Sequence, residues 1–279
     1  MSSYYDLPLL KPPVWTWEVP AYFFVGGAAG AAAALGAIAQ VTGADDALVR
    51  DARWIAAAGA TLSAPLLVAD LGRPERFLNM LRVFKLQSPM SVGALTLTAF
   101  GSASSAAAFA RLVRRNTNLP VRVLGDASAA VAAATGLVMA TYTGVLLGAT
   151  AIPVWNDNVR LLPVHFGASA LGSAVSLLEL RGHRDLSLNA LGLGAALFET
   201  LVAASLESRD DRVSAPLKRG RSGNLLRLAG ALSGPVPLAL RIFGARKAAA
   251  VATLAGSLLT RFAWVEAGKA SARDPQTAF

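Results

Sequence analysis

The chain has 279 residues, of which 54% are hydrophobic and only 15% are charged, and its formal net charge is +9. A soluble domain carries about a quarter charged residues, so this composition excludes an ordinary soluble protein and indicates one that lies in a membrane. The basic residues fall in short clusters between apolar runs, as they do in juxtamembrane loops. This placement argues against nucleic-acid binding.

Eight apolar runs are long enough to cross a bilayer as helices. We expect these helices at residues 17–41, 54–71, 89–110, 124–150, 162–180, 186–206, 225–243 and 248–268. The predicted fold is therefore all-α, a single integral membrane domain over residues 1–279 with both termini on one side, here called the terminal side. Lysines and arginines divide nearly evenly between the two sides, so the positive-inside rule assigns no orientation.

Small residues and prolines predict two local features of these helices. Gly26 and Gly30 stand four apart in the first run, a spacing that permits a close helix–helix contact. Pro235 and Pro237 interrupt the seventh run, where we expect a kink.

The second run ends in the sequence Asp-Leu-Gly-Arg-Pro-Glu-Arg-Phe, residues 70–77. An ionisable residue such as Asp70 at the end of a membrane helix indicates a functional site by default. The alternative is a helix end held in the head-group layer, with its arginines reaching water. Both interpretations remain open from these residues alone. The following segment, residues 73–88, is amphipathic and is expected to lie along the membrane surface.

The residues that commonly bind haem and iron are scarce. The chain contains no cysteine, which excludes a cysteine-ligated iron–sulfur cluster in this chain. Its two histidines, His165 and His183, would lie about 27 Å apart on one helix. We therefore expect neither a haem nor an iron–sulfur cluster in this chain, and electrons would have to reach it through another subunit.

Five polar residues are predicted to lie near the terminal side at similar depth. Glu18 and Tyr22 begin the first helix, Asp70 ends the second, Tyr142 approaches the end of the fourth, and His165 begins the fifth. Carboxylates, phenols and an imidazole suit a quinone head group, whose carbonyls need donors and whose redox chemistry needs proton exchange. The alternatives are interfacial aromatic residues, a hydrated Glu18 and a hydrogen-bonded interfacial histidine.

Two charged residues lie deeper in the predicted helices. Glu199 is well inside the sixth and Arg261 is half-way along the eighth. At that depth, charged side chains face the helix bundle and either pair or line a hydrated path. The sequence leaves open whether the two form a structural ion pair or part of a proton path.

Several segments in order resemble the NrfD/polysulfide-reductase family of integral membrane subunits. They are Trp15-Thr16-Trp17, the Phe-Phe-Val-Gly-Gly-Ala-Ala-Gly of residues 23–30, the motif at 70–77, Ser-Pro-Met-Ser at 88–91, and Tyr-Thr-Gly-Val-Leu-Leu at 142–147 with Pro153 and Trp155. The resemblance covers the first four helices. The second half of the chain matches in helix count and length.

The resemblance implies a multi-pass subunit of the cell (inner or cytoplasmic) membrane whose eight helices form two four-helix bundles. It also implies a site for a quinone, menaquinone or ubiquinone. The implied partners are a four-cluster ferredoxin-like iron–sulfur subunit, a molybdopterin-type catalytic subunit and membrane lipid. Tyr142 matches the family's quinone-contacting tyrosine, and Asp70 its acidic residue after the second helix. Glu18 and Tyr22 stand where the family often has asparagine and histidine.

We therefore predict a quinone- or quinol-interacting membrane subunit of a respiratory oxidoreductase, not catalytic on its own. It would exchange electrons between the quinone pool and the iron–sulfur partner, with or without proton transfer. The partner is expected on the terminal side, against residues 73–88, 149–161 and 207–223. One alternative is a passive membrane anchor of such a complex. Another is a small-solute or ion transporter, which Glu199, Arg261 and the proline kink would suit.

Overall fold

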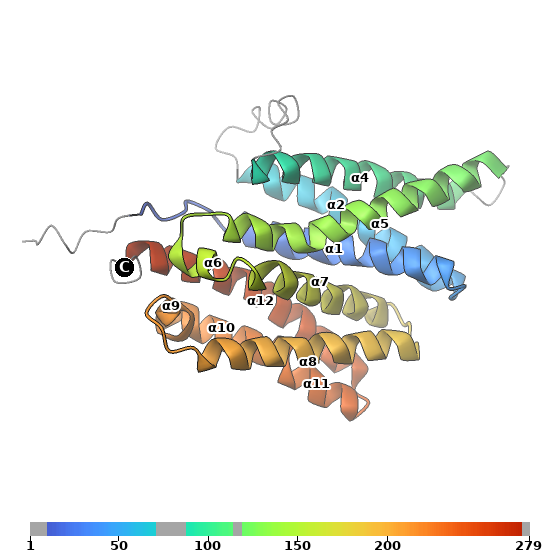
Figure 1. Ribbon diagram of the computed structural model, residues 1–279. Coiled ribbons are helices and arrows are strands. Elements are labelled where there is room, and N and C mark those ends of the chain that lie inside the picture. Colours follow the sequence, from blue (N-terminus) through green and yellow to red (C-terminus); the bar gives the residue numbers. More distant parts are fainter. Residues whose placement is uncertain (1–9, 71–87, 114–118, 275–279) are drawn as a thin grey trace, which may run out of the picture.

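The computed structural model describes residues 10–70, 88–113 and 119–274 (Figure 1). Within these ranges, eight helical spans are long and apolar enough to cross a membrane, which confirms the predicted all-α membrane fold. The spans are α1 (Glu18–Val41), α2 (Asp46–Ala69), α4 (Pro89–Val113), α5 (Leu119–Gly148), α7 (Leu161–Leu180), α8 (Leu186–Ser208), α10 (Gly220–Ser233) with α11 (Pro235–Ile242), and α12 (Arg246–Arg273). Two short helices, α6 (Pro153–Asp157) and α9 (Ala215–Lys218), lie between them.

Several helices extend beyond the apolar runs that predicted them. Helix α2 begins at Asp46 rather than near residue 54, because the Asp45 side chain accepts a hydrogen bond from the Ala47 N–H and caps the new first turn. Helix α5 begins at Leu119, and α12 continues to Arg273. Hydropathy measures the part of a helix that lies in hydrocarbon, whereas backbone hydrogen bonding continues into the polar residues on either side.

The predicted kink in the seventh span is a break in the helix. Helix α10 ends at Ser233, α11 begins at Pro235, and Gly234 between them has φ −107° and ψ −98°. A proline in the first turn of α11 needs no N–H partner there. A Cβ on Gly234 would lie 2.8 Å from the Thr200 hydroxyl oxygen, so the break lies tightly against α8.

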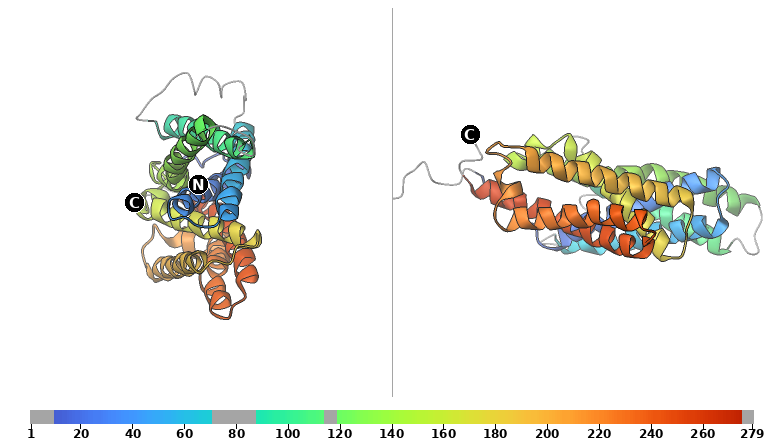
Figure 2. Two further views of the ribbon diagram at one scale, coloured as in Figure 1. Left: turned by 90° about the vertical axis from the view of Figure 1, so that its right-hand side faces the viewer. Right: turned by 90° about the horizontal axis from the view of Figure 1, so that it is seen from below.

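The spans pack in two connected circuits. Helix α1 contacts α2, α2 contacts α4, α4 contacts α5, and α5 returns to α1; this set is called the first group. In the second group, α7, α8, α10–α11 and α12 contact one another in the same way. Figure 1 shows α7 and α12 between the first group and α8, and Figure 2 shows the bundle from its end and from below. Both ends of the described chain lie at one end of the bundle, as eight crossings require.

Helices α1 and α5 touch through their backbones. A Cβ on Gly30 would overlap the Gly136 carbonyl, and one on Gly136 would lie 2.6 Å from the Gly30 carbonyl oxygen. One turn earlier, a Cβ on Gly26 would lie 3.1 Å from the end of the Met139 side chain. The close contact predicted from Gly26 and Gly30 is therefore confirmed, and its partner is α5.

The Gly30 contact generates a stability prediction. Gly30→Ala should lower the free energy of unfolding by about 1–3 kcal/mol, because the added methyl group forces two backbones apart. Gly194→Ala on α8, where a Cβ meets nothing within 4 Å, is the matched control and should leave stability unchanged or slightly raised. Thermal unfolding of the purified protein in detergent measures both. Equal melting temperatures for Gly30→Ala and the parent protein would contradict this account of the contact.

Candidate functional site

A small pocket opens among the first-group helices near the terminal side. Its free volume is about 50 Å³. Its lining is Trp15, Val19, Tyr22, Phe23, Leu67, Asp70, Met90, Gly93, Ala94, Tyr142 and Leu146. Three of the five terminal-side residues singled out in the sequence, Tyr22, Asp70 and Tyr142, therefore lie around one mostly apolar space. They come from α1, the end of α2, and α5.

The two phenols of the pocket differ in their hydrogen bonds. Tyr142 donates to the carbonyl oxygen of Pro89, the first residue of α4. Gly93, one turn further along α4, makes room for the Tyr142 ring, since a Cβ there would overlap it. The Tyr22 hydroxyl, on a side chain only 2% exposed, makes no hydrogen bond with the described residues. Tyr22 is thus the phenol of this pocket whose proton is free for a ligand.

Glu18 reaches the pocket indirectly, through Thr16. The Thr16 N–H and hydroxyl lie 3.4 and 3.2 Å from the Asp70 carboxylate, and the hydroxyl also contacts the Glu18 carboxylate. A hydroxyl has only one proton to donate. That proton is directed at one of the two carboxylates or shared between them. The Thr16 hydroxyl therefore links Glu18 to Asp70 at the edge of the pocket.

The side of the pocket formed by Trp15 is held in place by contacts that lead to the second group. Trp15 stacks on Trp155 of α6, with ring centroids 5.3 Å apart. Trp155 is fully buried and donates its indole N–H to the Trp264 carbonyl on α12 at 2.8 Å. A Cβ on Gly268 would overlap the Trp155 ring, so α12 is shaped to receive it. The segment before α1 is therefore held against both groups.

His165 lies away from the pocket, in a second polar cluster. Its Nε2 is 3.0 Å from the Glu199 carboxylate, which also accepts a hydrogen bond from the Ser233 hydroxyl at 3.0 Å. His165 and Glu199 are each 3% exposed. The structure therefore joins a residue predicted near the membrane surface to one predicted deep in the bundle.

Arg261 does not pair with Glu199, although the two were considered as a structural ion pair. Its guanidinium donates to the Phe166 carbonyl at 3.0 Å and lies over the Phe166 ring, 4.2 Å from the centroid. Arg261 thus contacts a carbonyl and an aromatic face, and one carboxylate oxygen of Glu199 contacts a histidine and a serine. The Nε and Nη1 of Arg261 and the other carboxylate oxygen of Glu199 are buried without a hydrogen-bond partner among the described residues.

Sequence reasoning missed a buried ion pair at the opposite side of the membrane. Arg241 of α11 binds the Glu179 carboxylate of α7 through two hydrogen bonds of 2.8 and 2.7 Å, and both side chains are at most 2% exposed. Each residue lies at the end of an apolar run next to other charges. Residues so placed resemble loop charges in the sequence, so only the tertiary structure reveals the pair.

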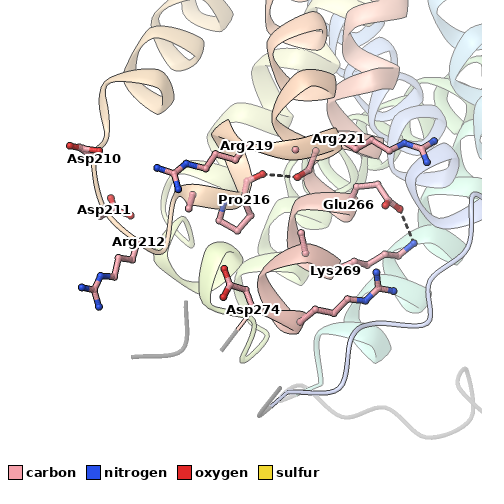
Figure 3. A pocket seen from close by; sticks show the side chains of 14 residues that line it. Asp210, Asp211, Arg212, Pro216, Arg219, Arg221, Glu266, Lys269 and Asp274 are labelled. Carbon is pink, nitrogen blue, oxygen red and sulfur yellow. Dashed lines mark hydrogen bonds and ion pairs between the residues drawn. The ribbon is translucent and has the colours of Figure 1, made fainter. Parts of the chain in front are cut away.

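A larger, charged cavity of about 630 Å³ lies on the terminal side, where α9, α10 and α12 meet (Figure 3). Its charged lining is Asp210, Asp211, Arg212, Arg219, Arg221, Glu266, Lys269, Arg273 and Asp274. Lys269 pairs with Glu266 at 3.0 Å. The side chains of Arg212, Arg219 and Arg221 make no ion pair with the described residues. This surface therefore carries charges of both signs and includes three arginines without an ion-pair partner among the described residues.

Parts of the sequence prediction fall on residues 71–87, which lie outside the described residues. They include all of the motif at 70–77 except Asp70, and nearly all of the amphipathic segment. Within the described ranges, no three histidine, aspartate or glutamate side chains gather in a group that would hold a metal ion.

The eight spans define a multi-pass membrane protein. A sequence model of the family described as polysulphide reductase, NrfD, matches residues 8–182. The chain therefore belongs to the NrfD family, whose members are membrane subunits of respiratory oxidoreductases and are associated with quinones. A comparison with curated proteins found no match. The family match confirms the resemblance and extends through α7, so it includes the pocket and His165 but not Glu199 or Arg261.

The buried ion pair generates the next prediction. Glu179→Gln should destabilise the protein by about 3–5 kcal/mol, because it leaves the Arg241 charge buried and uncompensated. The control is Glu207→Gln, which removes the same charge from the solvent-exposed pair with Arg227 and should not change the unfolding midpoint measurably. Chemical denaturation in detergent compares the two. Equal midpoints would show that water reaches the Glu179–Arg241 pair.

Proposed function

We propose that this chain binds a quinone or quinol head group in the pocket among α1, α2, α4 and α5, and exchanges electrons between the membrane quinone pool and an iron–sulfur partner. The observation that carries the proposal is the meeting of Tyr22, Asp70 and Tyr142 around one apolar space. These residues come from three separate segments of the sequence. An apolar pocket with a few convergent polar groups is the usual form of a small-ligand site.

The polar groups of the pocket fit the two ends of such a head group. A quinone takes up two electrons and two protons on reduction. Tyr22 has an unused hydroxyl proton, which can be donated to a carbonyl in a setting where water competes poorly. Asp70, through Thr16 and Glu18, can exchange protons with the membrane surface. Tyr142 holds the first turn of α4 in place and presents its oxygen as an acceptor.

Binding requires the pocket to widen. An aromatic ring occupies a cavity of about 150 Å³ in a protein interior, and the free volume here is about 50 Å³. Met90 lines the pocket with 47% of its surface exposed, and methionine side chains change rotamer at low cost. Displacement of Met90 towards the lipid would open the space between α1 and α4. We therefore propose that the head group enters the pocket past Met90.

The iron–sulfur partner is proposed to dock on the terminal side, because the electron path to the pocket is shortest there. The charged cavity shown in Figure 3 faces that side, and its unpaired arginines complement an acidic protein surface. A molybdopterin-type catalytic subunit would then bind through the iron–sulfur subunit.

Pocket variants test the site. Tyr22→Phe should lower quinone-linked turnover about tenfold, the effect of losing one buried hydrogen bond to the ligand. Asp70→Asn should also lower it, because the amide cannot take up a proton. Both should retain activity of the catalytic partner with an artificial dye, which bypasses the membrane. Thr135→Val, which removes a hydroxyl bonded only within α5, is the control. Unchanged quinone kinetics in Tyr22→Phe, Tyr142→Phe and Asp70→Asn would favour the passive anchor.

Charge reversal tests the docking side. The double variant Arg219→Glu/Arg221→Glu should reduce co-purification of the iron–sulfur subunit, because it replaces attraction by repulsion across the interface. Arg122→Glu, an exposed arginine at the opposite end of the bundle, is the matched control and should assemble normally. Loss of the partner in Arg122→Glu but not in the double variant would contradict docking on the terminal side and place the interface at the opposite end of the bundle.

A further inference from the structure

A line of buried polar side chains follows one face of α7. His165, Ser169, Ser173, Ser176 and Glu179 recur at spacings of four, four, three and three residues, and none exposes more than 3% of its surface. Residues at these spacings share a helix face. Burying hydroxyls costs free energy unless each finds a partner. The Ser173 hydroxyl donates to the Ser169 carbonyl of the same helix at 2.8 Å, whereas the Ser176 hydroxyl has no partner among the described residues.

Helix α12 presents polar groups to the same region. Helices α7 and α12 are in contact. Thr253, Ser257, Thr260 and Arg261 follow the helical spacing along α12, and each exposes at most 7% of its surface. The Ser169 hydroxyl donates to the Ser257 hydroxyl at 2.8 Å. The two helices therefore enclose a polar seam in the middle of the second group. We call it the α7 polar line.

The line has a titratable pair at one end and a cavity at the other. His165 and Glu199 form the end nearer the terminal side. At the opposite end, Glu179 lines a cavity of about 590 Å³ together with His183, Arg184 and residues 244–248. Fourteen residues separate His165 from Glu179, which is about 21 Å along a helix axis. The line therefore covers most of a hydrocarbon core about 30 Å thick.

Several atoms of the line lack a protein partner although they are buried. They are the Ser176 hydroxyl, the Nδ1 of His165 and one carboxylate oxygen of Glu199. Buried polar groups are nearly always hydrogen-bonded to protein or to ordered water. A water molecule bridging successive turns would satisfy these atoms and join them. Hydroxyls and water both donate and accept, which is the property that proton transfer along a chain requires.

We propose that the α7 polar line is a proton conduit between the cavity at Glu179 and the His165–Glu199 pair. A proton enters from the cavity beside the Glu179–Arg241 pair, passes as successive hydrogen-bond transfers along the serine hydroxyls and bridging water, and is held by His165 and Glu199. Each intermediate group receives one proton and releases one, so its charge is unchanged. The inference rests on the proposed quinone function, which consumes two protons per quinone reduced and releases two per quinol oxidised.

The end of the line lies close to the head-group pocket. The His165 ring contacts Phe166, with centroids 6.1 Å apart, and Phe166 contacts Phe23 at 6.4 Å. Phe23 lines the pocket. Two aromatic rings therefore separate the conduit from the site where protons are consumed or released. Because the cavity opens opposite the terminal side, proton supply through this route would move charge across the membrane.

Proton access along the line can be measured without quinone. The chain has no native cysteine, so Ser173→Cys and Ser176→Cys each introduce one thiol whose S–H infrared band shifts when the proton exchanges with heavy water. The matched control is Ser104→Cys on α4, equally buried and bonded only within its own helix. In the full-length protein in vesicles, exchange at the two line positions should be at least about tenfold faster than at the control. Equal rates would overturn the conduit.

A second measurement tests whether the α7 polar line carries protons during quinone turnover. In membranes containing the assembled complex, Ser173→Ala/Ser176→Ala should lower the number of protons moved per electron at least about twofold while quinone turnover continues. Ser104→Ala should leave the ratio unchanged. A ratio unaffected by the double variant would overturn the conduit and leave the pocket standing. Conversely, Tyr22→Phe tests the pocket alone, because it should lower turnover without changing thiol exchange on α7.

Discussion

The backbone contact between α1 and α5 at Gly30 and Gly136 is the constraint on which the rest of the structure depends. It lets α1 sit where it touches α2 and α5 of its own group and α7 and α12 of the second. A larger side chain at Gly30 would separate α1 from α5, and the pocket between them would lose its walls. In a bilayer, where lipid competes for apolar surface, such close packing is a main source of helix association.

Polar groups in this protein follow a second constraint, since hydrocarbon offers them no hydrogen-bond partners. The protein supplies these hydrogen-bond partners from its own residues, in separate places. Near the terminal side, the hydroxyl of Thr16 joins Asp70 to Glu18. In the second group, His165 joins Glu199, and Arg241 joins Glu179. Each pair links residues from different segments of the chain, so these contacts also fix how the helices are arranged.

The family match and the pocket concern the same part of the chain. Residues 8–182 include every side chain that lines the pocket and all of the polar face of α7. The partners of that face, among them Glu199, Ser257 and Arg261, come from helices beyond the match. The family match therefore covers the first group and α7, and helices beyond the match complete the polar line.

The sequence by itself determined the number of spans, the shared side of the termini, the break near Pro235 and the family, because hydropathy, glycine spacing and proline act locally. It also selected Tyr22, Asp70 and Tyr142, whose depth follows from their position along each helix. Only the tertiary structure decided that His165 faces Glu199 rather than the pocket, that Arg261 lies on Phe166, and that Glu179 meets Arg241. Depth can be counted along a sequence, but the direction in which a side chain points is set by how each helix is rotated against its neighbours.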